Sequence, residues 1–281
     1  MRVAVTGSHG FIGSALVESL ERDDHAVVRI ARDQIGADAL QGAEAVVHLA
    51  GEPIAARRWS PEQKRKILDS RTEITATLAT ALSAMDQRPR VLVSGSAIGY
   101  YGDRGDEVLR ENSGPGDDFL ADVCQAWEAA TAAASDAGIR VAHIRTGLVL
   151  GKGGALAKML PLFRFGLGGR FGAGRQWWSW IAMEDQIGAI RYVLDHDLDG
   201  PVNLTGPAPV TNVEFTHALG GVLHRPAVLP VPRFGPALIL GGELADQLLF
   251  SSQRVEPAVL ADHGYRFRYA DVASALAAAV A

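Results

Sequence analysis

The 281-residue sequence predicts an α/β fold, in which a doubly wound parallel sheet is followed by a small C-terminal α/β lobe. Short apolar runs that suit buried parallel strands alternate with stretches of helical periodicity. A glycine-rich turn joins the first run to the first helical stretch, an order that is typical of the start of a doubly wound sheet. The length suits one such domain with an appended lobe.

Composition excludes several other classes of protein. The net charge of −5 offers no basic field, which argues against nucleic acid as a principal partner. The single cysteine, Cys124, excludes an internal disulfide and fits a reducing compartment. The first strand begins directly after Arg2 and no apolar run approaches the ~18 residues of a membrane span. We therefore expect a cytoplasmic protein with no membrane contact. Its scattered histidines and lack of Cys-x-x-Cys predict no metal site.

The first strand and helix carry the strongest signal, the stretch VAVTGSHGFIG at residues 3–13. Gly7 permits a tight turn, Gly10 lets the backbone approach a pyrophosphate, and Gly13 lets helix and strand pack closely. The free N–H groups at the helix start then hold the anion. The alternative is a purely structural glycine turn. We expect the cofactor contacts of this corner to be Gly7, Ser8, Gly10, Phe11, Ile12 and Gly13.

The second strand, predicted over 25–30, decides which dinucleotide binds, because its end faces the adenosine ribose. Arg32 follows the strand directly, and a guanidinium suits the 2′-phosphate of NADP by charge and by its fork geometry. Arg29 is a weaker candidate for the same role. Asp33 would reverse the preference if it pointed inward, and both arginines could instead be solvated. The sequence therefore favours NADP over NAD, with Arg32 as the recognition residue.

The third strand, predicted over 45–51, follows too short a gap for another helix, strand and helix. Residues 33–44 should therefore contain no paired strand, which leaves the second strand at the sheet edge. Small residues end the third strand, and we expect Leu49, Ala50 and Gly51 to lie against the cofactor. His48 lies inside the run, where a buried, hydrogen-bonded histidine is commoner than a catalytic one.

The next helix begins with a serine cap at Ser60, and Gln63 is placed to close a capping box. Arg57 and Arg58 come just before it, beyond a strand end where ligands bind, and they are candidates for an anionic-substrate contact. The fourth strand, predicted over 90–93, runs into a serine- and glycine-rich turn over 94–102.

Four stretches together resemble one family of enzymes: HLAGEPI, SGSAIGYYG, RTGLVLGKGGALAKMLPLF and GRQWWSWI, the last followed by NLTGP. They resemble the atypical extended short-chain dehydrogenases described as epimerase-family, or cell-division-inhibitor-like, proteins. The resemblance implies a Rossmann domain, NADP binding, a small C-terminal lobe and a substrate that is generally unassigned. It also implies that Ser96 hydrogen-bonds a substrate carbonyl or alcohol, with Ser94 and Gly95 beside the cofactor. The alternative for this serine stretch is a simple turn.

The family's Tyr-x-x-x-Lys pair is missing from this chain. Within a helix predicted over 119–137, Leu120 stands at the tyrosine position and Cys124 at the lysine position. Leucine carries no proton, and a thiol among apolar neighbours keeps a raised pKa. If proton transfer occurs, Tyr100 or Tyr101 is the better candidate for the donor.

The remaining chain is predicted to add two more strands to the sheet. A fifth strand is predicted over 140–145 and a sixth over 200–205, with helices from Thr211 and over 271–281. The tryptophans of the stretch WWSW either wall a pocket or lock the lobe against the sheet. We assign 1–146 and 181–206 to the NADP-binding domain, and 147–180 and 207–281 to a substrate lobe.

Two functions follow. One is an NADP-dependent oxidoreductase or epimerase with a non-standard active site, acting on a small-molecule substrate, with a homodimer as a possible assembly. The other is a catalytically silent NADPH-binding sensor or scaffold.

Overall fold

A computed structural model describes residues 1–281, and a six-stranded parallel sheet forms its centre. Every neighbouring pair of strands in this sheet is parallel. This confirms the doubly wound α/β prediction. The strand order across the sheet is β2 (Ala26–Ile30), β1 (Arg2–Thr6), β3 (Ala45–His48), β4 (Val91–Ala97), β6 (Arg140–Thr146) and β10 (Gly200–Leu204).

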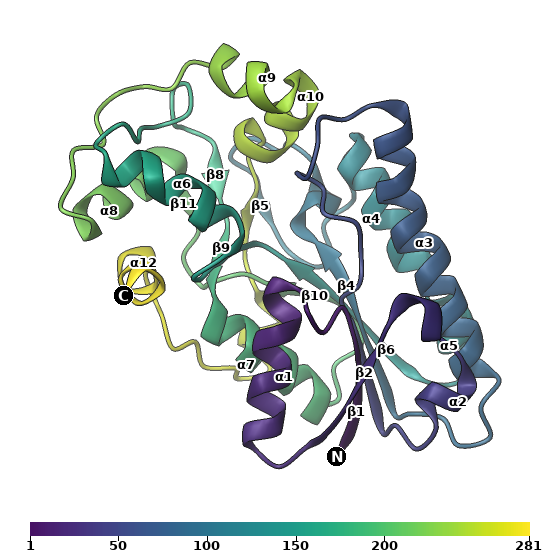
Figure 1. Ribbon diagram of the computed structural model, residues 1–281. Helices are drawn as coiled ribbons and strands as arrows, with labels where there is room; N and C mark the ends of the chain where they lie inside the picture. Colours follow the sequence, from purple (N-terminus) through teal and green to yellow (C-terminus); the bar gives the residue numbers. More distant parts are fainter.

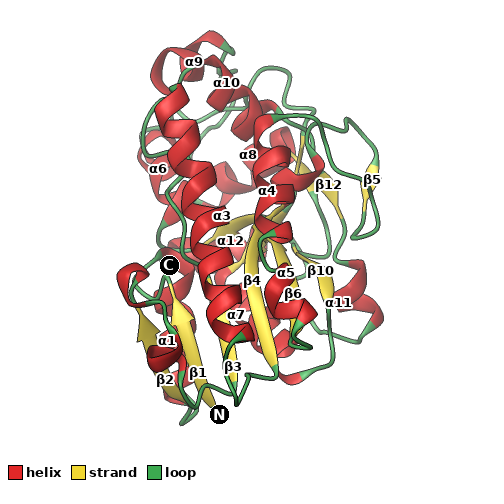
Figure 2. Ribbon diagram, turned by 90° about the vertical axis from the view of Figure 1, so that its right-hand side faces the viewer, coloured by secondary structure: helices red, strands yellow, loops and turns green.

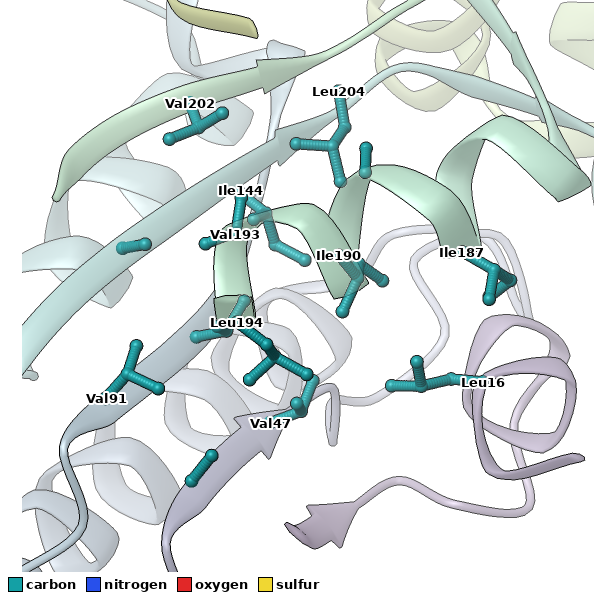
Figure 3. Packing of buried hydrophobic residues seen from close by; sticks show 14 of the residues in the cluster. Leu16, Val47, Val91, Ile144, Ile187, Ile190, Val193, Leu194, Val202 and Leu204 are labelled. Atoms are coloured by element: carbon teal, nitrogen blue, oxygen red, sulfur yellow. The ribbon is translucent and has the colours of Figure 1, made fainter. Parts of the chain in front are cut away.

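Helices cover both faces of the sheet (Figure 1). One face carries α1 (Phe11–Arg22) and α7 (Met183–Asp195), and the other carries α3 (Pro61–Ser83), α4 (Phe119–Ala129) and α5 (Ala132–Asp136). Alternate strand residues fill the two cores. Val3 and Val5 face α1 and α7, whereas Ala4 packs with Leu78 and Leu82 of α3. Figure 3 shows the first core, where Leu16 and Ile190 approach Val47.

The sheet ends at β2, as the short gap predicts. Residues 33–44 form no paired strand; the segment holds a 3₁₀ turn, η1 (Arg32–Gln34), and the short helix α2 (Ala37–Leu40). Leu40 of α2 is fully buried in the core beside α3. The missing strand would have been an edge strand, so the core stays closed without it.

Three local predictions need correction. Ser94 and Ser96 lie inside β4, because strand pairing with β6 continues to Ala97, and a 3₁₀ turn η2 (Ile98–Tyr101) follows. The helix predicted over 119–137 is broken at 130–131 into α4 and α5. Ser60 accepts a hydrogen bond from the Gln63 amide at 3.2 Å, but Gln63 does not complete the capping box, and its buried Nε2 has no partner.

The lobe lies beyond the carboxyl ends of the strands (Figure 2). Trp178 and Trp180 are buried in its core, and Trp177 donates to Asp106 at 2.9 Å, so the tryptophans bind the lobe together and to the loop after β4. Val149 and Leu260 pack with the sheet core instead. The lobe and its connections comprise β5 (Val108–Leu109), β7 (Leu148–Leu150), α6 (Gly154–Arg164), β8 (Trp177–Trp178), β9 (Trp180–Ala182), β11 (Val210–Thr211), α8 (Asn212–Val222), α9 (Phe234–Leu240), α10 (Gly242–Ala245), the π-helical turn η3 (Asp246–Phe250), β12 (Arg254–Val255), α11 (Ala258–Asp262) and α12 (Val272–Val280).

Asp185 in α7 ties the end of the lobe to the sheet domain. Its buried carboxylate accepts hydrogen bonds from the Arg268 and Tyr269 amides at 2.7 and 3.1 Å.

None of the helices combines the length and the apolar character that crossing a bilayer requires.

Candidate functional site

The glycine corner brings the ends of β1 and β3 into contact. Gly7 has a φ of +68°, and a Cβ there would lie 2.7 Å from the Leu49 carbonyl carbon and 2.8 Å from the Ala50 nitrogen. A Cβ on Gly13 would overlap the backbone oxygen of Gly7. These two glycines are therefore required by the fold itself. They also place the expected cofactor contacts from β1 and β3 side by side.

Gly10 has a different role, because the fold leaves space beside it. Its backbone is extended (φ −75°, ψ 171°), and an added Cβ would meet only the Gly7 oxygen, at 3.2 Å. No side chain caps α1, so the N–H groups of Phe11, Ile12 and Gly13 have no acceptor within the protein. Orphan donors at an uncapped helix start are a site for an anion, so this corner fits a pyrophosphate.

The two candidate arginines near the end of β2 differ in their partners. Arg29 pairs with Glu21 at 2.8 Å, whereas Arg32 is exposed and makes no ion pair with the protein. Asp33 is also exposed. Arg32 is therefore the guanidinium that remains free to meet a 2′-phosphate.

A depression of about 300 Å³ lies on the outer side of α1, beside the glycine turn. Two carboxylates line it, which makes it unsuited to a pyrophosphate. Its lining residues are Ser8, His9, Ser14, Val17, Glu18, Glu21 and Arg29.

His48 is fully buried and structural, as expected. Its Nδ1 lies 2.6 Å from the Thr6 hydroxyl and its Nε2 lies 2.9 Å from the Thr75 hydroxyl. Burial lowers the pKa of His48 to about 4, so the ring stays neutral near neutral pH. Both ring nitrogens are used within the fold.

Two of the expected cofactor residues on β4 are enclosed by protein. Ser94 is fully buried, and a Cβ on Gly95 would lie 2.8 Å from the Trp127 indole. Gly95 is needed for packing against α4, and the Ser94 side chain has no route to a ligand. The Phe11 ring is similarly occupied, since it packs on Gly153 and Gly154.

Ser96 belongs to a buried polar network. Its hydroxyl donates to Glu128 Oε1 at 2.7 Å, and both carboxylate oxygens of Glu128 accept from Arg145, at 2.8 and 2.9 Å. The side chains of Glu128 and Arg145 are only 13% and 4% exposed. The Ser96 proton is committed to Glu128 and the Cys124 thiol also lies beside Oγ, so a substrate hydroxyl would donate to a remaining lone pair of this oxygen.

The two tyrosines after Ser96 differ in exposure. Tyr101 is fully buried; its hydroxyl donates to Asn203 Oδ1 at 2.7 Å and accepts from Arg145 at 3.1 Å. Burial raises the pKa of Tyr101 to about 12. These contacts argue against Tyr101 as a proton donor. Tyr100 is half-buried, its hydroxyl makes no hydrogen bond, and its ring centroid lies 3.4 Å from the Arg145 guanidinium. Tyr100 is therefore the better candidate of the two for a proton donor.

Leu120 and Cys124 share one face of α4, as their spacing predicts. A Cβ on Gly99 would lie 3.3 Å from the Leu120 Cβ and 3.9 Å from the Cys124 Sγ, which places both beside the η2 turn. Burial and the nearby Glu128 carboxylate raise the pKa of Cys124 to about 12, so the thiol carries no charge. The position where the family pattern has a lysine is therefore electrically neutral.

Arg57 and Arg58, which the sequence offered as contacts for an anionic substrate, are not part of the Ser96 network. Arg58 donates to the backbone oxygens of Leu238 and Ile239, at the end of α9, and so holds the lobe against the loop after β3. Arg57 is exposed.

A different arginine, Arg71 of α3, lies next to Gly51, and the local sequence did not single it out. The local sequence gives no clue to Arg71, which is one of several charged residues of α3, and only a weak clue to Arg145, a charge inside a buried strand.

Comparison with known proteins identifies relatives along the whole chain. Residues 3–204 match the family model described as the NAD dependent epimerase/dehydratase family, and residues 231–279 match a domain of unknown function, DUF1731. An epimerase family protein of Mycobacterium leprae is 43% identical over 98% of this chain and 94% of its own length.

Solved structures agree with this similarity. The human epimerase family protein SDR39U1, crystallised with NADPH, superposes with a TM-score of 0.94 at 34% identity, over 99% of both chains. A UDP-glucuronic acid 4-epimerase of Bacillus cereus gives a TM-score of 0.80 over 99% of this chain and 98% of its own, but at 16% identity it supports the fold alone.

Proposed function

The chain belongs to the NAD-dependent epimerase/dehydratase family, and on that premise we propose that it is an NADPH-dependent oxidoreductase. Its substrate class is a small carbonyl, alcohol or sugar nucleotide. The observation that carries this proposal is the Ser96 hydroxyl, held by Glu128 at the carboxyl edge of a sheet whose glycine corner fits a dinucleotide. NADPH in the human relative supports the choice of cofactor.

The cofactor is expected to lie along the carboxyl ends of the strands. The N–H groups at the start of α1 would hold the pyrophosphate, and Arg32 would meet the 2′-phosphate. Gly10, Ala50 and Gly51 provide the backbone surface for close approach. NADPH, when bound, supplies the hydride. Because Arg32 has no carboxylate partner, we expect NADPH to bind more tightly than NADH.

The chain's own residues would orient the substrate and manage its proton. Ser96 accepts a hydrogen bond from a substrate alcohol, since its own proton is held by Glu128. Tyr100, four residues after this serine, has a free hydroxyl and can donate the proton that a carbonyl oxygen gains on reduction. Arg145 fixes both groups, through Glu128 on one side and the Tyr100 ring on the other.

A screen of carbonyl substrates, followed by the loss of NADPH absorbance, tests this function. Tyr100→Phe should lower kcat by about 10²–10⁴-fold, the usual effect of removing a general acid. In the reverse direction, oxidation of the alcohol with NADP, Ser96→Ala should reduce kcat/KM by at least about tenfold, because Oγ no longer accepts the hydrogen bond of the substrate hydroxyl. Ser83→Ala is the matched control and should leave activity unchanged, because this half-buried serine at the end of α3 donates only to the Thr80 backbone oxygen. An activity that survives both site substitutions would overturn this assignment.

A second function is favoured by one observation. The Tyr-x-x-x-Lys positions hold Leu120 and Cys124, and neither side chain can exchange a proton near neutral pH. A chain that binds NADPH with high affinity but consumes no substrate would fit a sensor of the NADPH/NADP ratio or a scaffold. The same screen separates the two functions, because only the first predicts turnover.

A further inference from the structure

We propose that Arg71 supplies the fixed positive charge for the nicotinamide-ribose half of NADPH, in place of the lysine that the family pattern would put at Cys124. The inference rests on the proposed cofactor but does not depend on turnover. Arg71 comes from α3, whereas the family's lysine comes from the helix that is α4 in this chain.

The geometry places Arg71 where the cofactor is expected. Its guanidinium carbon lies 3.2 Å from the position that a Cβ on Gly51 would take, and 5.0 Å from the centroid of the Trp127 ring. Gly51 follows directly on the Leu49-Ala50 segment that touches the glycine turn. Trp127 stands three residues after Cys124 on α4, so Arg71 reaches across toward the vacant lysine position.

No carboxylate forms an ion pair with Arg71, and the Glu52 carboxylate acts on its charge only from a greater distance. Its Nη1 donates to the backbone oxygens of Glu52 and Ile67, at 3.0 and 3.1 Å, and its Nε and Nη2 have no acceptor. Two other largely buried arginines differ, because Arg140 pairs with Asp197 at 3.4 Å and Arg145 pairs with Glu128 at 2.8 Å.

An unpaired guanidinium with free donors is costly to keep in a half-buried position. Burial lowers the pKa of Arg71, and the nearby Cys124 and Glu52 oppose this shift only in part. A ligand rich in oxygen atoms would accept hydrogen bonds from the free N–H groups and so offset the cost of burying the guanidinium. The ribose hydroxyls and the adjoining phosphate of a dinucleotide provide such acceptors.

Cys124 cannot perform this role itself. Its thiol is neutral and buried, and it lies beside the η2 turn that carries Tyr100. Arg71 lies close enough to Cys124 for its positive charge to oppose in part the rise that burial causes in the thiol pKa. The fold therefore keeps a positive charge near the vacant position but supplies it from the neighbouring helix, α3.

Titration with two ligands tests the assignment. NADPH carries the nicotinamide ribose, whereas 2′,5′-ADP ends at the adenosine half. Arg71→Met should raise the Kd for NADPH by about 10–100-fold, the effect of losing charge-assisted hydrogen bonds, and leave the Kd for 2′,5′-ADP unchanged. Arg71→Lys, which keeps the charge, should recover most of the affinity for NADPH.

Arg32→Ala is the matched control, because it should weaken both ligands. Unchanged 2′,5′-ADP binding by Arg71→Met also shows that the glycine corner is folded. An unchanged Kd for NADPH in Arg71→Met, or an equal loss for both ligands, would overturn the proposal. Absence of turnover would contradict only the proposed reaction, since these readouts measure binding alone.

Discussion

Gly10→Val is expected to abolish NADPH binding while the chain remains folded. The backbone at Gly10 is extended, which valine adopts readily, and an added Cβ would meet only the Gly7 oxygen, at 3.2 Å. The branched side chain would instead fill the space through which a pyrophosphate reaches the helix start. Loss of two charge-assisted hydrogen bonds, at about 1.5–3 kcal/mol each, lowers affinity by more than about 100-fold.

Two glycines provide the controls for this experiment. Gly221 of α8 is exposed and nothing lies within 4 Å of an added Cβ, so Gly221→Val should bind NADPH as the native chain does. Gly13→Ala should fail by a different route, since its Cβ would overlap the Gly7 oxygen and destabilise the fold. Binding is measured by titration against tryptophan fluorescence, and folding by thermal unfolding. Tight NADPH binding by a folded Gly10→Val variant would mean that the cofactor lies elsewhere.

Arg145→Met should lower the free energy of unfolding by about 3–5 kcal/mol, because it leaves the Glu128 carboxylate buried and unpaired. The substitution also removes the donor to Tyr101 and to the Glu111 backbone oxygen, at 3.1 and 3.2 Å. Ser96 would keep its bond to Glu128, so the serine alone cannot compensate. Denaturant unfolding measures the loss.

A double variant distinguishes the cost of leaving one buried charge unpaired from the contribution of the ion pair itself. Arg145→Met combined with Glu128→Leu removes both charges, and we expect it to recover much of the stability lost in the single variant. A loss below about 1 kcal/mol in Arg145→Met is the range of an exposed ion pair, and it would contradict the buried network described here.

The fold could be predicted because its signals are local. The apolar runs, the glycine spacing and the short gap over 33–44 each determine a neighbouring piece of backbone. The sheet, its edge strand and the glycine corner therefore follow from the sequence. The end of β4 could not be predicted in the same way. Ser94 and Gly95 have turn-like composition, but pairing with β6 and packing against Trp127 keep them in a strand.

The site was predictable only in part, because its side chains meet across long stretches of chain. Glu128 and Arg145 come from α4 and β6, and the Tyr101 hydroxyl finds Asn203 in β10. Local periodicity carries no information about such partners. The same reason hid Arg71, which reads as an ordinary polar residue of a long helix until α3 is packed beside Gly51 and Trp127.

Amide hydrogen exchange with and without NADPH tests most directly where the cofactor lies. The orphan N–H groups of Phe11, Ile12 and Gly13 should exchange more slowly when a pyrophosphate accepts them, and so should the segment from Leu49 to Gly51. The lobe, residues 147–180 and 207–281, should change far less. Unchanged exchange in both segments, with protection confined to the outer side of α1 near Glu21 and Arg29, would contradict a dinucleotide site in the glycine corner.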